Sequence, residues 1–399
     1  MIIRADYALL APGVARRDVR LEVDGPRIVQ VRSGFALERV RPDYDCGLAV
    51  LTPGLVDPHA HLELQFCAGR TPYRGSFFDW LQRVFKLKQR HGGVTAFPRK
   101  SLSALAAAGC TTVVDHHSHA LNWPAIRRAG LRYYPLREFF EFDNHRPKLT
   151  ELRKKAHWGY AAHAPYTASA QVARACRQLS DETGRPLSIH LAEVPGELRF
   201  IKSGDDAEII AMLTERGIYD RRFTGTGLTP VGYCAKLGLL DRATYAIHVN
   251  YCADGDLELL SDLKPTVVFC PRSHAFFDHP AHPLPRYLNA GVPVALGTDS
   301  LASNDRLSPL YEAALVRREY PQVAAADVFS AITAAALTPL GMARQLGRLE
   351  PGCLADLAVF KLPGQPKSDD FASLLDAVIR VGKSALTICD GKVIHEDDR

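Results

Sequence analysis

Four histidines and one aspartate stand at or near the ends of short apolar runs in this sequence. They are His59, His61, His190, His248 and Asp299. His59 and His61 are two residues apart, so their side chains would share one face of a strand. Imidazole nitrogens and a carboxylate that meet at one point suit a hydrolytic zinc or iron(II) centre. The pattern therefore predicts one metal site, and an enzyme rather than a binding module.

Two further residues have types and positions that suit proton transfer or substrate binding. Glu193 comes three residues after His190, just past the apolar run, where a general acid or base would be needed. The alternative is a glutamate that merely favours the start of a helix. His163 ends another apolar run and could hydrogen-bond the substrate, or it could pack before a proline turn. The predicted catalytic residues are Glu193, Asp299 and His248.

Cationic and aromatic side chains near the strand ends are candidates for substrate binding. Arg272 and Arg137 could each hold a carboxylate through two hydrogen bonds, or form an ordinary ion pair. Trp80 and Phe78 could close over a ring, or simply pack a loop. The predicted substrate-binding residues are His163, Arg272, Arg137, Trp80 and Glu63.

A second group of histidines follows Asp115. His116, His117 and His119 are interpreted as structural residues or as support for the ligands, because the first set already completes a site. A two-metal centre usually needs a bridging group such as a modified lysine. The predicted strand Tyr160–His163 contains no lysine, which favours a single metal.

Eight short apolar segments must position these side chains. They are rich in Val, Ile, Leu and aromatic residues and mostly too short for helices. Helix-like stretches lie between them, including 99–108, 168–183, 206–215 and 307–319. This alternation predicts an α/β fold, a (β/α)8 TIM barrel. The predicted strands are Gly54–His59, Thr111–Asp115, Arg132–Arg137, Tyr160–His163, Leu187–Leu191, Tyr245–Val249, Thr266–Cys270 and Pro293–Gly297.

Both ends of the chain have a different character. Val19–Val23 and Asp356–Phe360 alternate apolar and other residues in the manner of strands. Neither end is long enough to form a stable sheet alone. We therefore predict one small β-sandwich built from residues 1–52 and 350–399, beside a metal-dependent hydrolase barrel formed by residues 53–349.

Composition narrows the class of protein. The net charge of +5 is modest and spread along 399 residues, which indicates no nucleic-acid partner but could favour an anionic small substrate. The start lacks a signal-peptide pattern, and no run approaches the roughly 18 apolar residues of a membrane span. The nine cysteines are scattered, without a CxxC pair. These features predict a cytoplasmic protein with reduced thiols. Exposed barrel helices could support a homodimer.

Six motifs carry a resemblance that covers essentially the whole chain. With them the chain resembles the amidohydrolase superfamily, in the branch of cytosine, guanine and S-adenosylhomocysteine deaminases and triazine hydrolases. The motifs are PGLVDPHAHLE at 53–63, HAPYT at 163–167, SIHLAE at 188–193, AIHVNY at 246–251, LGTDSLAS at 296–303 and LEPGCLADLAVF at 349–360.

Some stretches are more specific within that branch. Residues 61–63, 78–81, 191–204 and 268–277 resemble the aminofutalosine deaminases, which serve the futalosine route to menaquinone. The chain departs from many deaminases of the branch at His274, where they carry an asparagine after the serine. Because of this departure, the resemblance does not identify the substrate. It still implies hydrolytic chemistry.

The resemblance implies a deamination that depends on one divalent ion, Zn²⁺ or Fe²⁺, which makes water a nucleophile near neutral pH. Asp299 would accept the proton of the water, Glu193 would protonate the ring nitrogen, and His248 would stabilise the developing oxyanion. The predicted substrate is 6-amino-6-deoxyfutalosine. Alternatives are S-adenosylhomocysteine, methylthioadenosine, guanine, a chlorinated triazine or a cyclic amide. A non-catalytic barrel that has lost its metal is disfavoured, because every predicted ligand position carries a residue that can bind a metal ion.

Overall fold

A parallel barrel forms the centre of the molecule. The computed structural model describes residues 1–34, 41–90, 99–118, 121, 123–140, 149–156 and 158–397. Eight strands pair in the order β13-β12-β11-β10-β9-β8-β7-β6, and each neighbouring pair in this order is parallel. A parallel bridge between Ala60 and Asp299 connects the first strand to the end of the last. The barrel strands are β6 Leu55–Ala60, β7 Cys110–His117, β8 Arg132–Phe139, β9 Gly159–Ala162, β10 Leu187–Leu191, β11 Thr244–His248, β12 Thr266–Phe269 and β13 Val294–Leu296.

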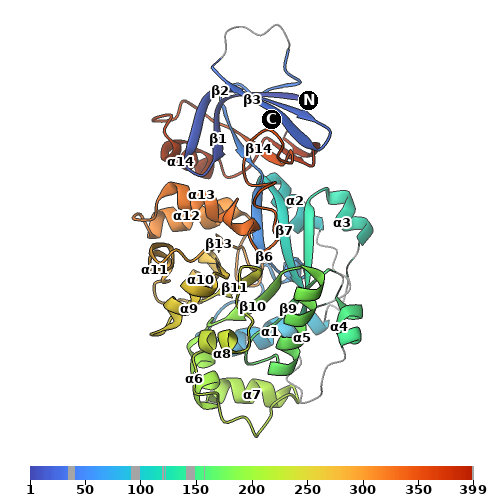
Figure 1. The fold of residues 1–399 in the computed structure, drawn as a ribbon, viewed down its shortest axis with the longest axis vertical. Coiled ribbons are helices and arrows are strands. Elements are labelled where there is room, and N and C mark those ends of the chain that lie inside the picture. Colours follow the sequence, from blue (N-terminus) through green and yellow to red (C-terminus); the bar gives the residue numbers. More distant parts are fainter. Residues whose placement is uncertain are drawn as a thin grey trace.

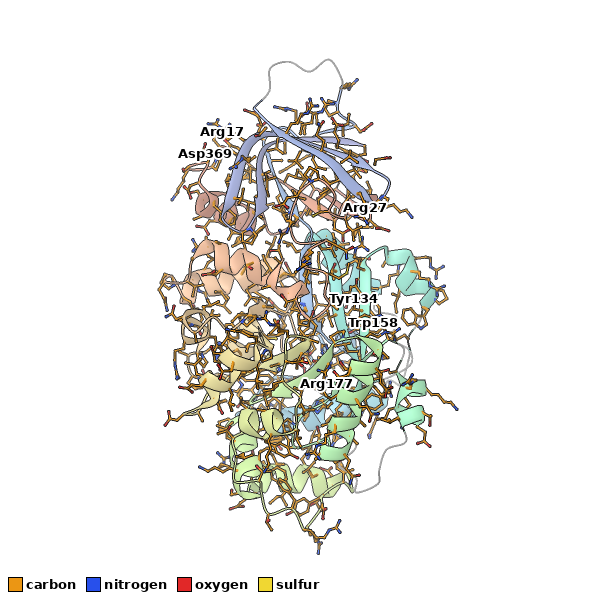
Figure 2. The ribbon with its side chains drawn as sticks, in the orientation of Figure 1. Arg17, Arg27, Tyr134, Trp158, Arg177 and Asp369 are labelled. Carbon is orange, nitrogen blue, oxygen red and sulfur yellow. The ribbon has the colours of Figure 1, made fainter. Side chains whose placement is uncertain are left out.

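Burial on both faces explains why these strands lack a polar side. Alternate residues such as Val56, Leu136 and Ile247 form a cluster inside the barrel. The residues between them pack outward against the helices in a larger cluster. Tyr134 and Trp158, labelled in Figure 2, lie with ring centroids 4.9 Å apart near the strand starts. Side chains therefore fill the interior of the barrel. All eight predicted strands are confirmed, with their ends within a few residues of the predicted ones.

Helices alternate with the strands, as expected for this fold. The predicted helix starts at Ala168 and Asp206 are too early. Ser169 and Asp206 are instead the N-terminal caps of helices that begin at Ala170 and Ala207. Ser169 Oγ accepts from Val172 N at 3.3 Å, and Asp206 Oδ1 accepts from Ile209 N at 3.0 Å. The described helices are α1 Phe77–Arg90, α2 Arg99–Ala107, α3 Trp123–Ala129, α4 Leu149–Lys155, α5 Ala170–Thr183, α6 Pro195–Ser203, α7 Ala207–Glu215, α8 Pro230–Lys236, α9 Asp256–Leu263, α10 Pro271–Phe276, α11 Leu284–Asn289, α12 Pro309–Glu319, α13 Ala325–Ala331 and α14 Phe371–Val381, with 3-10 turns at Leu62–Cys67 and Ala335–Leu337.

Strands from both ends of the chain join in a second, mixed sheet. β5 pairs antiparallel with β14, so Leu51 lies opposite Val359 and the two ends are linked. Inward side chains of both ends, including Ile3 and Ile388, share one buried cluster, as the predicted sandwich requires. Figure 1 shows this sheet at the top, with both termini. Its strands are β1 Ile2–Ala11, β2 Val14–Asp24, β3 Arg27–Ser33, β4 Tyr44–Asp45, β5 Ala49–Pro53, β14 Leu357–Lys361, β15 Leu386–Cys389 and β16 Lys392–Glu396.

An ion pair ties the second sheet to the barrel. Arg132 at the start of β8 donates to both carboxylate oxygens of Asp356, at 2.8 and 3.0 Å. Asp356 directly precedes β14 and is 3% exposed.

The exact boundaries between the terminal β-domain and the barrel, at residues 52 and 350, stay a prediction. None of the described helices is long and apolar enough to cross a lipid bilayer.

Candidate active site

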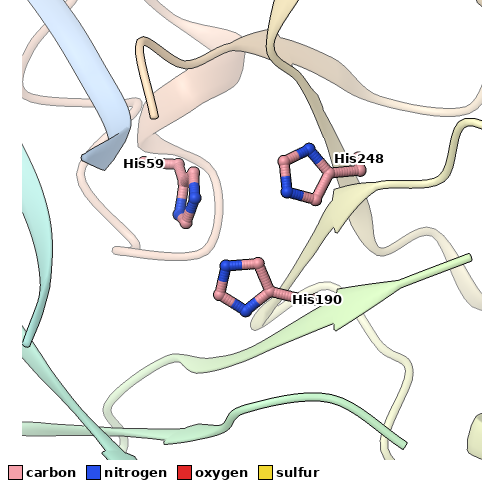
Figure 3. A group of neighbouring side chains, drawn as sticks. All are labelled: His59, His190 and His248. Atoms are coloured by element: carbon pink, nitrogen blue, oxygen red, sulfur yellow. The ribbon is translucent and has the colours of Figure 1, made fainter. Parts of the chain in front are cut away.

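The strand-end histidines and Asp299 converge at the carboxyl end of the barrel. His59 lies in β6, His190 in β10, and His248 ends β11. Figure 3 shows these three imidazoles facing one another from separate strands. Their ligand atoms lie within 4.8 Å of one another, and the same limit holds for the group of His59, His61 and Asp299. The convergence of parallel strand ends thus brings together residues that are up to 240 positions apart.

The donor atoms fit a divalent metal ion. His59 Nε2 is buried and has no hydrogen-bond partner among the described residues, although Asp299 Oδ1 lies 3.8 Å away. His61 Nε2 lies 3.9 Å from the same oxygen. Burial lowers the pKa of His61 to about 3 and that of His190 to about 4. The imidazoles are therefore neutral at physiological pH, which is the form that binds metals.

Hydrogen bonds on the opposite side of the rings orient these imidazoles. His61 Nδ1 lies 3.1 Å from the carbonyl oxygen of His116, and His190 Nδ1 lies 3.0 Å from that of His163. His59 Nδ1 lies 3.1 Å from His116 Nδ1. Such contacts fix which ring nitrogen would face a bound ion. His116 therefore contacts two of the predicted ligands, as its predicted role in supporting them requires. His117 is buried in β7, and His119 lies outside the described residues.

The carboxylate of Asp299 is held by two hydroxyl groups. Ser273 Oγ donates to Asp299 Oδ2 at 2.6 Å, and Ser303 Oγ donates to the same oxygen at 3.0 Å. Oδ1 is the oxygen that faces His59 and His61. Gly297 is required nearby, because a Cβ there would lie 2.9 Å from His59 Cβ. The absence of a side chain at Gly297 allows the last strand to approach the first.

Glu193 lies beside the ligand cluster and is almost fully buried. Its Oε1 is 3.4 Å from His248 Nε2. Its backbone NH donates to Glu197 Oε2 at 3.0 Å, and its carbonyl accepts from Asn250 Nδ2 at 3.0 Å. Burial, then the nearby Asp299 and Glu197 carboxylates, raise the pKa of Glu193 well above its usual value. The site therefore favours a protonated carboxyl that can donate a proton.

His274 supports this arrangement indirectly. Its Nδ1 lies 3.1 Å from Asn250 Oδ1, and its Nε2 lies 2.8 Å from the carbonyl oxygen of Pro280. Asn250 in turn holds the backbone of Glu193. The histidine that departs from the branch pattern therefore connects through Asn250 to the backbone of Glu193.

A pocket lined partly by aromatic side chains leads to these residues. Its apolar walls come mainly from α1 and from residues after β8 and β9. Trp80, Glu63 and His163 line it, as predicted for substrate-binding residues, whereas Phe78 packs against Tyr166. Glu63 accepts a hydrogen bond from Ser118 Oγ at 3.0 Å and forms an ion pair with Lys88. The lining residues are His61, Glu63, Leu64, Phe77, Trp80, Leu81, Val84, Phe85, Lys88, Glu138, Phe140, His163, Tyr166, His190, Glu193, His248, Asp299 and Ser300.

The two predicted arginines do not line this pocket. Arg272 forms an ion pair with Asp305, and its Nε donates to Asn304 Oδ1 at 3.1 Å. Arg137 alternates with the inward residues of β8 and so points out of the barrel interior. Its buried Nε has no hydrogen-bond partner among the described residues. The structure therefore brings neither guanidinium to the ligand cluster.

Glu138 is a residue of the pocket that the sequence reasoning missed. Its carboxylate oxygens lie 3.8 Å from His61 Nδ1 and 3.9 Å from His190 Nδ1. Burial raises its pKa to about 8. The predicted strand ends one residue earlier, at Arg137. The alternation of Tyr134 and Leu136 as inward residues could have revealed that Glu138 also faces inward.

Comparisons with known proteins agree with this geometry. A model described as the amidohydrolase family matches residues 50–394. A 5-methylthioadenosine/S-adenosylhomocysteine deaminase of Nitratidesulfovibrio vulgaris is 28% identical, over 89% of this chain and 82% of its own length. A protein of the same description from Pyrococcus abyssi is 26% identical, over 98% of this chain and 91% of its own length.

Solved structures share the fold. Helicobacter pylori aminofutalosine deaminase in complex with methylthio-coformycin superposes with a TM-score of 0.85 and 21% identity, over 98% of this chain and 99% of that one. An adenosine deaminase of Xanthomonas campestris with bound zinc gives a TM-score of 0.80 and 22% identity, over 98% and 92% of the two chains. At these low sequence identities, the similarity to the two solved structures shows a shared fold alone.

Proposed function

The chain belongs to the amidohydrolase family and is a hydrolase of carbon–nitrogen bonds, and we propose that its reaction is the metal-dependent deamination of an adenine-type nucleoside. The observation that carries this proposal is the position of Glu193. A buried carboxyl with a raised pKa lies 3.4 Å from His248 Nε2, within a pocket and beside the ligand cluster. Deamination of an aminopurine needs a proton donor next to the point of attack by water.

His59, His61, His190, His248 and Asp299 would hold the divalent ion, zinc or iron(II). Bound there, the ion would supply a water acidic enough to attack near neutral pH. The supporting observation is the buried Nε2 of His59, which has no hydrogen-bond partner among the described residues and faces the other donors. His248 would in addition help to stabilise the oxygen that becomes negative.

The chain's own residues account for the proton transfers. Asp299, held through Oδ2 by Ser273 and Ser303, would accept a proton from water at Oδ1 as oxygen bonds to the ring carbon C6. Glu193 would donate its proton to the adjacent ring nitrogen. The proton on Asp299 would then pass to the exocyclic amine, and the C6–N bond would break as ammonia leaves. The C6 hydroxyl would give its remaining proton to Glu193, which restores the protonated carboxyl and leaves the oxo group. Water and the substrate thus give ammonia and the oxo product.

The pocket lining supports a nucleoside with a large apolar substituent. Phe77, Trp80, Phe85, Phe140 and Tyr166 surround the space in front of the reacting groups. Aromatic walls stack well on bases and on other rings. Within this class we propose 6-amino-6-deoxyfutalosine, an intermediate of menaquinone biosynthesis, as the substrate. Methylthioadenosine and S-adenosylhomocysteine are the second candidates, because the curated relatives carry those names.

The test is ammonia release by the purified, zinc-loaded protein. The panel contains 6-amino-6-deoxyfutalosine, methylthioadenosine, S-adenosylhomocysteine, adenosine and guanine. We expect ammonia from adenine-type nucleosides, loss of activity with a chelator and recovery with zinc or iron(II). A protein that binds metal but releases no ammonia from any member of the panel would contradict the nucleoside proposal. Ammonia from guanine alone would replace it with another reaction of the branch.

A further inference from the structure

Arg216 brings a guanidinium to the edge of the pocket. It is the C-terminal cap of α7, and its Cζ lies 3.5 Å from the ring centroid of Phe85 in α1. Phe85 is one of the pocket-lining residues. Stacking on an aromatic ring orients a guanidinium while its NH groups stay available at the rim. The ring therefore holds this exposed cation against a residue that lines the pocket.

Arg216 has no carboxylate partner within the part of the chain that the structure describes. No acidic side chain of the described residues forms an ion pair with Arg216, and burial lowers its pKa, partly offset by the charge of Glu215. Lys88 also lines the pocket, but it is paired with Glu63 and hydrogen-bonded to Ser118 Oγ. Of these two cations, Arg216 is the one with capacity for a ligand.

The electrostatic influence of Arg216 reaches residues deep in the pocket. Burial is the main cause of the low pKa of His163, and the charges of His190, His61 and Arg216 add to it. Burial also raises the pKa of Tyr166, against a lowering contribution from Arg216. His163 and Tyr166 both line the pocket. Together with the contact on Phe85, these charge effects support a position of Arg216 beside the pocket.

We propose that Arg216, stacked on Phe85, binds an anionic group at the far end of the substrate and selects carboxylated nucleosides over uncharged ones. This inference rests on the proposed deamination and names the substrate class of the same site. It replaces Arg272 as the carboxylate-binding residue, because Arg272 is engaged with Asp305 and Asn304. The carboxylate would accept two hydrogen bonds from the planar guanidinium.

The test compares Arg216→Gln with the parent enzyme on matched substrates. One pair is 6-amino-6-deoxyfutalosine and its carboxamide, which differ by a single charge. The other is S-adenosylhomocysteine and methylthioadenosine. For the carboxylated member, we expect kcat/KM to fall by about 10- to 100-fold, the usual scale for a hydrogen-bonded charge, and mainly through KM. For the uncharged member, the expected change is less than about threefold. Arg216→Lys should lose less than Arg216→Gln.

Arg222→Gln is the matched control. Arg222 is an exposed arginine after the same helix, paired with Asp220, so its loss removes one positive charge from the protein without touching the pocket. We expect unchanged kinetics for this variant. Equal losses in Arg216→Gln and Arg222→Gln, or equal effects on both members of each pair, would overturn the role of Arg216 while leaving the deaminase proposal intact. Absence of ammonia from every substrate with the parent enzyme would overturn both proposals.

Discussion

The hydroxyl group of Ser273 donates a 2.6 Å hydrogen bond to Oδ2 of Asp299. Ser303 donates to the same oxygen, so Oδ1 is left to face His59 and His61 at 3.8 and 3.9 Å. Ser273 lies at the start of α10, 26 residues before Asp299. The two residues meet only because the ends of β12 and β13 are neighbours in the barrel.

Ser273→Ala should weaken metal binding. Losing the group that orients a ligand commonly lowers metal affinity or activity by about 10- to 100-fold. The measurement is competition for zinc with a chromogenic chelator. Ser308→Ala is the control, because the buried Ser308 hydroxyl has no hydrogen-bond partner among the described residues. Equal zinc affinity in the Ser273 variant and the parent would show that Ser273 does not position Asp299.

Glu193→Gln should retain the metal and lose turnover. The amide cannot donate an acidic proton to the substrate, so kcat should fall by about 10²-fold or more. Elemental analysis should give the same metal content as in the parent enzyme, because the predicted ligands are unchanged. Near-parental turnover by this variant would reject the general acid role of Glu193.

Glu312 should make folding stability depend on pH. Its carboxylate is fully buried and accepts from Arg272 N at 2.9 Å and Asn304 Nδ2 at 2.8 Å. Burial raises its pKa from 4.5 to about 8. Below pH 4.5 both the folded and unfolded states hold the proton, and above pH 8 neither state does. Between these values only the folded state holds it, so the group's contribution to stability falls as pH rises.

The comparison is between the parent and Glu312→Gln in urea unfolding at a series of pH values. The amide of this variant does not titrate, so the variant should gain stability relative to the parent by up to roughly 1.4 kcal/mol per pH unit across that window. The changed hydrogen bonding of the amide adds an offset that does not vary with pH. A difference that stays constant from pH 4.5 to 8 would contradict the raised pKa.

Arg132→Ala should destabilise the contact between the barrel and the terminal sheet. It leaves the buried carboxylate of Asp356 without its main cationic partner, which costs about 1–3 kcal/mol. Thermal unfolding measures the loss as a lower Tm. Arg153→Ala is the control, because the ion pair of Arg153 with Glu182 is exposed and should contribute little. Similar Tm values for the two variants would show that the buried pair is not needed.

The sequence alone determined the barrel and indicated which residues stand at its strand ends. Each strand is a short, continuous apolar run, since it is buried on both faces, and such runs are legible without a structure. His190 and His248 could be placed because each stands at the carboxyl end of such a run, and parallel strands of a barrel present those ends at one face. The link between the two chain ends was predictable because neither end could form a sheet alone.

The tertiary structure decided what surrounds those ligands. Arg272 follows its strand as predicted, but contact with Asp305 and Asn304 directs its guanidinium away from the pocket. Arg216 comes from a helix without a ligand motif, and its place depends on how α7 packs against Phe85 of α1. The continuous apolar run that marks each barrel strand is a local feature, so it can be read from sequence. Contacts between loops and helices depend on long-range packing of specific side chains, which no local pattern records.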